Sequence, residues 1–240
     1  MIPVVPATWP LLRIRAFTTL REGGVSTGEW ASLNLATHVG DDLAAVAANR
    51  ERLRAQWSLP SEPRWLTQVH GTRVIAAEGI GHEPPKADGS FARADGIVCA
   101  VLTADCLPIV LADRRARGVM VLHGGWRGLA RGIISTGIEA LALPATDLSA
   151  WLGPAIGASD YEVGEEVRAA FPGVGAGVFR KTGRDRYHAD LYALARVLLQ
   201  VAGVADIYGG GWSTRREARW FSYRRTRTCG RMATLAWIAR

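Results

Sequence analysis

The sequence predicts an α/β (α+β) protein in which residues 1–240 form a single domain with a mixed β-sheet flanked by helices. Strand-like and helix-like segments mix along the chain without strict strand–helix–strand alternation, and this favours a mixed sheet. No internal repeat or linker-like segment divides the chain. Its 48% hydrophobic and 21% charged residues are typical of a soluble globular protein, and 240 residues are enough to bury a sizeable core.

Local patterns place the elements of the N-terminal part. Alternating β-forming residues indicate strands, apolar residues at helical spacing indicate helices, and clusters of proline, glycine and aspartate indicate loops. On these grounds we expect a strand over 12–20, a helix over 41–59 capped by Asp41 or Asp42, a strand pair over 64–78 joined at Gly71 and Thr72, and a loop over 81–96.

The same patterns place the elements of the remaining chain. Three consecutive apolar runs predict strands, and two longer segments with apolar residues at helical spacing predict helices. We expect strands over 96–105, 106–113 and 118–125, a helix over 126–143, a buried strand and turn over 149–157, a short helix over 161–171, a helix over 190–204 closed by Gly203, and short strands over 205–208 and 233–239.

Charge and hydropathy exclude two classes of partner. The net charge is +7 and the isoelectric point about 9.9, but scattered arginines supply almost all of this charge, without a basic stripe or a nucleic-acid-binding motif. We therefore expect no nucleic acid, and the basic surface suits a small molecule that carries phosphate. The N-terminus lacks a charged signal-peptide region, and no run reaches the roughly 20 apolar residues of a membrane span, so a cytoplasmic protein without a membrane partner is expected.

Three residues could carry chemistry at strand ends. His70 in "TQVHG" and His123 in "VLHGG" each end an apolar run and precede glycine, and Cys106 follows Asp105 at the junction of two predicted strands. Each alone could be a core residue, as Cys99 is expected to be. An odd number of cysteines, three, argues against a disulfide framework. The other histidines are expected to be loop or surface residues: His38, His82 and His188.

One cysteine and two histidines fit two kinds of site. The first is a catalytic zinc centre with three protein ligands and an open fourth position. The second is a nucleophilic Cys–His pair, with Cys106 activated by His123. No CxxC or HExxH motif chooses between them. The segment "GGWRG" after His123 opens a predicted helix, where backbone N–H groups and Arg127 could contact an anion.

A set of motifs in fixed order resembles a known family. From about Phe17 to Ile238, the chain is similar to the multicopper polyphenol oxidoreductase or laccase-domain family, members of which have been reassigned as purine nucleoside phosphorylases with adenosine deaminase activity. The motifs that carry the resemblance are "GGVS", "SLNLATHVGDD", "NR", "TQVHG", "ADCLPI", "HGGWRG", "GPAIG", "YEVGEEV" and "GRMATLAWI". The resemblance implies a single mixed α/β domain of the YfiH-like fold.

The resemblance also implies a site and an activity. His70, Cys106 and His123 would be the catalytic residues and would bind zinc. Phosphorolysis would convert adenosine, inosine, guanosine and methylthioadenosine to base and ribose 1-phosphate or its thio analogue, with adenosine deamination as a second activity. The substrates are purine nucleosides and phosphate, and no obligate protein partner is expected. Further assignments are Asn34, Gln68 and Arg127 as substrate or phosphate contacts, with Gln68 and Asp105 as orienting groups.

Composition limits what the laccase description can mean. A multicopper oxidase needs about ten histidines to bind its copper ions, and this chain has five. A multicopper cluster is therefore excluded, although a single copper could replace zinc at such ligands. The alternatives to the zinc enzyme are a metal-free cysteine hydrolase or deamidase that uses Cys106 and His123, a single-copper polyphenol oxidase, and a non-enzymatic binding protein.

Overall fold

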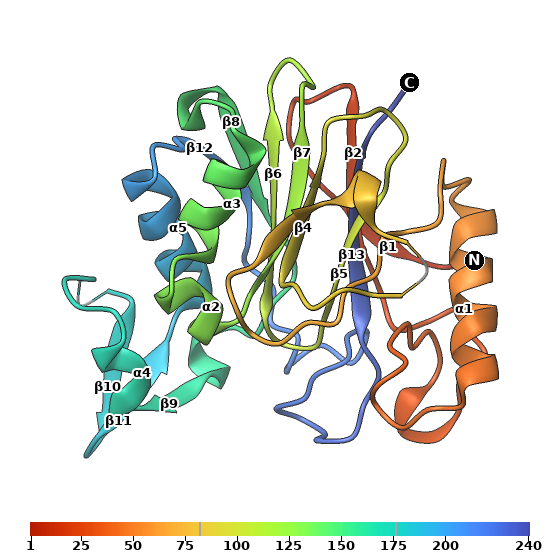
Figure 1. The fold of residues 1–240 in the computed structure, drawn as a ribbon. Helices are drawn as coiled ribbons and strands as arrows, with labels where there is room; N and C mark the ends of the chain where they lie inside the picture. The colour runs from red at the N-terminus through yellow and green to blue at the C-terminus, as the bar shows by residue number, and fades with distance from the viewer. Residues whose placement is uncertain (82, 176) are drawn as a thin grey trace.

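The structure, a computed structural model, describes residues 1–81, 83–175 and 177–240 (Figure 1). His82, which the sequence assigns to a solvated loop, lies outside these residues. Two β-sheets stack at the centre, with helices on both outer sides, and a smaller sheet projects from one end. The mixed α/β class predicted from the sequence is confirmed.

The strands of the described residues form three sheets. In the four-stranded sheet the spatial order is β1 (Val4–Pro6), β2 (Ile14–Thr19), β13 (Met232–Ile238) and β5 (Cys99–Thr103), all antiparallel. In the six-stranded sheet it is β12 (Asp206–Gly209), β8 (Leu148–Leu152), β6 (Leu107–Asp113), β7 (Val119–Gly124), β4 (Gly89–Ala92) and β3 (Val74–Ala76). The third sheet contains β10 (Phe179–Gly183), β11 (Arg186–Ala189) and β9 (Glu162–Gly164).

The six-stranded sheet is mixed, as the sequence predicts. Its outer pairs β3–β4 and β12–β8 are parallel, and its inner pairs are antiparallel. The five α-helices of the described residues are α1 (Leu43–Gln56), α2 (Trp126–Ala130), α3 (Ile133–Leu141), α4 (Glu165–Ala169) and α5 (Leu191–Val201). Short 3-10 helices lie at Gly28–Trp30, Ala77–Gly79, Ala145–Asp147 and Ala158–Asp160.

Helices cover the outer faces of the two stacked sheets. Helix α1 lies outside the four-stranded sheet, and α3 and α5 lie outside the six-stranded sheet (Figure 1). Asp42 accepts a hydrogen bond from the amide of Ala44, so Asp42 caps α1 as expected. Gly203, with a φ of +91°, ends the helix predicted over 190–204, because glycine adopts this conformation without steric cost.

Alternation along the central strands builds the core. In β6, Ile109 and Leu111 face the helices, whereas Val110 faces the other sheet. In β13, Ala236 faces the six-stranded sheet and Trp237 faces the opposite side. Because successive side chains in a strand point to opposite faces and both faces are buried here, these strands are continuous apolar runs in the sequence.

Two N-terminal predictions are wrong in part. In segment 64–78 only β3 is a strand, because the amides of residues 69–71 donate to the carboxylate of Asp88 instead of joining a ladder. The segment 81–96 is not entirely a loop, because it contains β4 in the interior of the sheet. At Gly89 a β-carbon would lie 2.5 Å from Leu122 Cδ2, so a residue typical of loops allows close strand packing.

Further differences follow from local backbone geometry. The helix predicted over 126–143 is two helices, α2 and α3, because Gly132 has a φ of +88° and interrupts the helical path. In segment 161–171, β9 precedes a shorter helix, α4. Strands β1, β10 and β11 were not predicted. No helix in the described part of the chain is long and apolar enough to cross a membrane.

Candidate active site

The antiparallel pairing of β6 and β7 brings Cys106 and His123 together. Leu107, the first residue of β6, pairs with Gly124, the last residue of β7. Cys106 immediately precedes β6 and His123 lies near the end of β7, so both reach the same edge of the sheet. The strands that the sequence predicts at 106–113 and 118–125 therefore place the thiol beside the imidazole.

His70 completes the group from a loop. One potential ligand atom from each of His70, Cys106 and His123 lies within 4.8 Å of the others, and the two imidazole rings are 4.7 Å apart between centroids, at 73°. Exposure changes across the trio: His123 is buried, Cys106 is partly buried and His70 is exposed. The trio is therefore open to solvent on the His70 side. His70 has a φ of +57°, which is uncommon for a residue with a β-carbon.

Asp88 supports both histidines from behind the trio. Its fully buried carboxylate accepts hydrogen bonds from Nδ1 of His123 at 2.9 Å and from the amide of His70 at 2.9 Å. It also accepts from the amides of Val69 at 3.1 Å and Gly71 at 2.7 Å. With Nδ1 donating to Asp88, Nε2 is the ring nitrogen of His123 that serves the trio: it donates to the Cys106 thiolate when the ring is protonated and can bind a metal when it is not.

The electrostatics of the site favour an ionised thiol. Burial alone would raise the pKa of Cys106, but the positive charge of His123 and hydrogen bonds from both histidines outweigh it and lower the pKa to about 6. Burial alone would lower the pKa of His123, but the Cys106 charge and Asp88 raise it to about 9. By contrast, burial raises the pKa of Cys99 to about 12, as expected for a core thiol.

The donor set fits a zinc ion with an open coordination position. Cys thiolates and His nitrogens are the ligands that zinc prefers, and catalytic zinc sites use three protein ligands. Thiolate ligands must be deprotonated, which the lowered pKa of Cys106 favours. The carboxylate of Asp88 behind His123 is the arrangement that orients metal-bound histidines. The trio is therefore a candidate metal site, and the same donors would also bind copper.

Gly125 explains why two glycines follow His123. A β-carbon at Gly125 would lie 3.0 Å from Cδ2 of His70, 3.4 Å from Sγ of Cys106 and 3.6 Å from Cε1 of His123. The distances to Cys106 and His123 are ordinary van der Waals contacts, but the 3.0 Å distance to His70 is tighter, so a side chain at position 125 would press on the His70 ring. The glycine is thus part of the geometry of the trio.

Asp105 joins Cys106 to the C-terminal loop. Its φ of +94° is uncommon for a non-glycine residue, and several contacts hold it in place. Its carboxylate accepts from the Thr214 hydroxyl and from the Arg224 amide, both at 2.6 Å, and its carbonyl accepts from the amide of Ile156 at 3.0 Å. These contacts join the backbone at Cys106 to the C-terminal loop, and the orienting role of Asp105 stays a prediction.

Arg225 organises the same loop. Its guanidinium donates to the carbonyls of Thr214 at 3.0 Å, Arg215 at 2.9 Å and Glu217 at 3.3 Å, and also to that of Trp220. One guanidinium thus satisfies four backbone acceptors that have no strand or helix to pair with. From the sequence, this arginine-rich segment is expected only to contribute surface charge.

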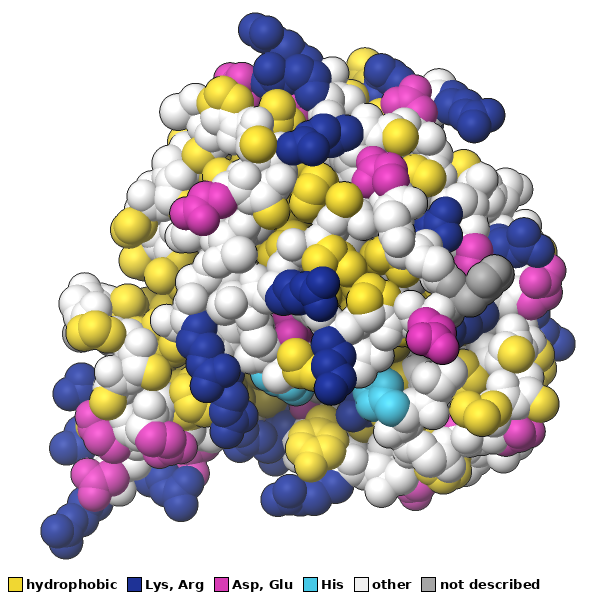
Figure 2. Space-filling view, in the orientation of Figure 1, with side chains coloured by type: hydrophobic (Ala, Val, Ile, Leu, Met, Phe, Trp, Pro, Cys, Tyr) yellow, Lys and Arg dark blue, Asp and Glu magenta, His cyan; other side chains and the backbone are white. Residues whose placement is uncertain are grey.

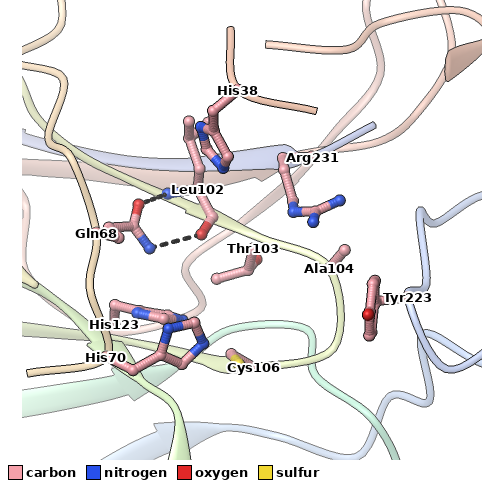
Figure 3. Close-up of a pocket in the computed structure, with 10 residues that line it drawn as sticks. All are labelled: His38, Gln68, His70, Leu102, Thr103, Ala104, Cys106, His123, Tyr223 and Arg231. Atoms are coloured by element: carbon pink, nitrogen blue, oxygen red, sulfur yellow. Dashed lines mark hydrogen bonds between the residues drawn. The ribbon is translucent and has the colours of Figure 1, made fainter. Parts of the chain in front are cut away.

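A cavity of about 320 Å³ contains the trio (Figure 3). The trio lies at one end, His38 and Arg231 lie at the other, and Tyr223 faces the interior from the side. The sequence analysis assigned His38 to a loop and did not single out Tyr223 or Arg231. In the sequence, His38 and Arg231 lie within the motifs "SLNLATHVGDD" and "GRMATLAWI", whereas Tyr223 lies in none of the family motifs. These residues come together only through tertiary contacts.

The remaining predicted substrate contacts occupy different positions. Gln68 lines the cavity, but its amide donates to the carbonyl of Leu102 at 2.8 Å and accepts from its amide at 2.7 Å, so Gln68 anchors the "TQVHG" loop to β5. The exposed Arg127 guanidinium lies 4.5 Å from the Trp126 ring centroid and does not line the cavity. His188 lies on β11, and its Nδ1 is 2.9 Å from the Arg180 guanidinium.

Asn34, which the sequence assigns as a substrate or phosphate contact, does not line the cavity. Asn34 is fully buried, and its amide donates to the Ala36 carbonyl at 3.0 Å and to Asp41 at 2.9 Å. Its oxygen accepts from the amides of Ala36 and Arg231, each at 3.0 Å. With all these groups bonded within the protein, Asn34 fixes the backbone at Arg231.

This fold, with a candidate metal site at the end of β6 and β7, belongs to a known family. The chain belongs to the family described as multi-copper polyphenol oxidoreductase laccase, whose family model matches residues 15–239. It is 44% identical over 243 residues to "Purine nucleoside phosphorylase YfiH" of Shigella flexneri, covering 99% of this chain and all of that protein. It is 43% identical to "Purine nucleoside phosphorylase PA4543" of Pseudomonas aeruginosa, covering 96% of each chain.

Solved structures agree with this assignment. The crystal structure of protein NMB0706 of Neisseria meningitidis superposes with a TM-score of 0.95 at 43% identity, covering 99% of both chains. That of YlmD from Geobacillus stearothermophilus superposes with a TM-score of 0.91 at 32% identity, covering 96% of this chain and 94% of the other. A Bacillus licheniformis protein, YfiH, shares the fold at 24% identity.

Proposed function

We propose that this protein is a zinc-dependent purine nucleoside phosphorylase that also deaminates adenosine. The observation that carries the proposal is the convergence of His70, Cys106 and His123 within 4.8 Å at the end of a cavity of about 320 Å³. A cavity of this size suits a small ligand. The names of the relatives support purine nucleosides as the substrates, with adenosine, inosine, guanosine and methylthioadenosine as candidates.

The cavity offers different environments for the parts of a nucleoside. The half-exposed Tyr223 and the side chain of Leu102 present aromatic and apolar surface for a purine ring. Arg231 and His38 present polar groups at the end away from the trio. The carboxylate of Asp88 keeps His123 oriented throughout, and Asp105 keeps the loop that carries Tyr223 against the site.

The two proposed reactions place different demands on these residues. In deamination, zinc held by the trio would supply a nucleophile at neutral pH by lowering the pKa of bound water. In phosphorolysis, a phosphate oxygen bonds to the anomeric carbon while the bond to the purine nitrogen breaks, and its electron pair leaves on the purine. That step needs positioning and fixed positive charge.

A metal-free cysteine enzyme is the second candidate. Hydrogen bonds from both histidines and a pKa of about 6 make Cys106 a thiolate at neutral pH, beside a protonated His123. This is the state of an activated cysteine nucleophile. Such an enzyme would be labelled covalently at Cys106 by an electrophilic substrate analogue and would remain active with a chelator present.

Product analysis tests the proposal. Purified zinc-loaded protein is incubated with adenosine, with and without phosphate, and the products are separated by chromatography. We expect adenine only with phosphate and inosine without it, and neither from the Cys106→Ala variant. The proposal fails if wild-type protein yields neither product above that variant.

A further inference from the structure

A second cavity of about 400 Å³ shares a lining residue, Tyr223, with the cavity that contains the trio. It lies between β9, β11 and the 223–227 loop, and Arg186, Arg224 and Arg227 line it. We call it the arginine cavity. Tyr223 lines both this cavity and the one that contains the trio, so the two cavities meet at its ring. Lys and Arg side chains gather beside the histidines on this face of the molecule (Figure 2).

The three arginines have no carboxylate partner within 4.0 Å in the described parts of the chain. Other arginines of the C-terminal loop do: Arg216 lies 2.8 Å from Asp160 and Arg215 lies 3.5 Å from the same residue. Within those same parts, Arg186 and Arg227 make no side-chain hydrogen bond, and Arg224 uses one nitrogen, NH1, to donate to the Glu162 carbonyl at 2.9 Å. Most guanidinium donors in the cavity are thus available to a ligand.

Two carboxylates also line the cavity, and they leave the arginines free. Glu162 accepts from the Thr182 hydroxyl at 3.3 Å, on β10, and Glu166 folds over Gly164 in the first turn of α4. Three guanidinium groups against two carboxylates leave the lining with a positive charge. The carboxylates can accept a hydrogen bond from a P–OH or a ribose hydroxyl, which a cavity lined only by cations could not do.

A backbone hydrogen bond connects the arginine cavity to the segment that carries Cys106. The amide of Arg224 donates to Asp105 at 2.6 Å, and Asp105 precedes Cys106. Tyr161, which lines the cavity, responds to both groups: burial and the Cys106 charge raise its pKa, whereas the charges of Arg224 and Arg127 lower it. A ligand held by these arginines would therefore lie next to the trio, across Tyr223.

We propose that the arginine cavity binds a phosphate oxyanion through Arg186, Arg224 and Arg227. Guanidinium groups match phosphate oxygens with paired N–H donors, and charge-assisted hydrogen bonds of this kind are stronger than neutral ones. Resting on the proposed phosphorylase function, the ligand is inorganic phosphate, held beside a nucleoside in the neighbouring cavity. A nucleotide phosphate has the same chemistry, and the experiment separates the two sources.

Binding measured directly tests the cavity. Zinc-loaded wild type and the Arg186→Gln/Arg227→Gln double variant are titrated calorimetrically with inorganic phosphate and, separately, with AMP. In the described parts of the chain these two side chains make no ion pair or hydrogen bond, and Arg227 lies 6.0 Å from the Tyr223 ring centroid, so the variant should keep its Tm and zinc content. Arg184→Gln is the matched control, since Arg184 is an arginine between β10 and β11 with 98% exposure.

The variant should bind phosphate about tenfold more weakly or worse, because it loses charged hydrogen-bond donors. Its KM for phosphate in adenosine phosphorolysis should rise by the same factor, with Arg184→Gln unchanged. A loss for AMP alone would assign the cavity to a nucleotide phosphate. If neither affinity changes, the proposal is overturned. A wild type that binds phosphate here but releases no adenine would refute the phosphorylase and leave the binding site intact.

Discussion

Replacing Asp88 by Asn removes one buried charge on which the whole trio depends. The carboxylate accepts four hydrogen bonds, two at each oxygen: His70 and His123 donate to Oδ1, and Val69 and Gly71 donate to Oδ2. An asparagine amide keeps one oxygen and puts an NH2 group at the other place. That NH2 group would face two N–H donors, whichever way the amide turns.

The consequences follow from that geometry. Losing two hydrogen bonds to a buried charged acceptor, at about 1.5–3 kcal/mol each, lowers the free energy of unfolding by about 3–6 kcal/mol. If the NH2 group faces His123, the imidazole must accept at Nδ1 and carry its proton on Nε2, where it can no longer bind a metal. Loss of such an orienting partner costs about 10–100-fold in metal affinity.

Urea unfolding measures the first effect and zinc titration against a competing chelator measures the second. Asp95→Asn is the control, because Asp95 is 41% exposed and pairs with Arg13 at the surface at 2.7 Å. A surface ion pair contributes about 1 kcal/mol or less, so the control should stay close to wild type. An Asp88→Asn protein with unchanged stability and a zinc Kd within twofold of wild type would refute this reasoning.

Three further changes probe the site. Gly125→Ala places a methyl group against the trio and should weaken zinc binding about tenfold or more, because a displaced ligand loses its geometry, whereas Gly79→Ala, with open space around it, should not. In metal-free protein, iodoacetamide should modify Cys106 but not Cys99, with a rate that falls as the pH drops through about 6, since only the thiolate reacts; mass spectrometry of the labelled peptides decides. Arg225→Ala should lower Tm and raise KM for adenosine, because four backbone carbonyls of the loop lose their hydrogen-bond donor. An unchanged KM would contradict the expectation that an ordered loop supports substrate binding.

The meeting of Cys106 and His123 could be predicted because it depends on local patterns. Two apolar runs separated by a short polar segment make an antiparallel pair, and the start of one strand must then lie beside the end of the other. His70 could be added only as a residue of the same chemistry near glycine. The expectation that it ends a strand is wrong, because its segment follows the Asp88 carboxylate instead of a β-ladder.

Asp88 was missed because its surroundings resemble a solvated loop. "KADGS" carries proline and glycine neighbours and charged residues, and such composition normally indicates a turn. Burial of this segment comes from β4, which pairs with β7, a strand that lies later in the chain. A strand whose pairing partner is far away in the sequence leaves no local sequence signal, because tertiary contacts outweigh the local preference for a turn.

Asn34 and Tyr223 show what motifs alone do not reveal: Asn34 lies in a motif but not in the cavity, and Tyr223 lies in the cavity but not in a motif. Asn34 lies in a motif of the family, yet the motif reflects a buried network that fixes the backbone of Arg231. Tyr223 lies in a segment without regular structure, and long-range contacts such as that of Asp105 with the amide of Arg224 bring this segment to the cavity. Sequence motifs locate residues that matter, but the structure is needed to separate positioning from contact.

Metal reconstitution tests the central claim, that the trio is a metal centre on which turnover depends. The protein is stripped with a chelator and zinc is returned in steps, while bound metal and adenine formed from adenosine and phosphate are measured in the same samples. Activity and bound zinc should rise together and level off near about one zinc per chain, as three ligands with one open position require. Full turnover by the metal-free protein would contradict the account and favour Cys106 as a nucleophile.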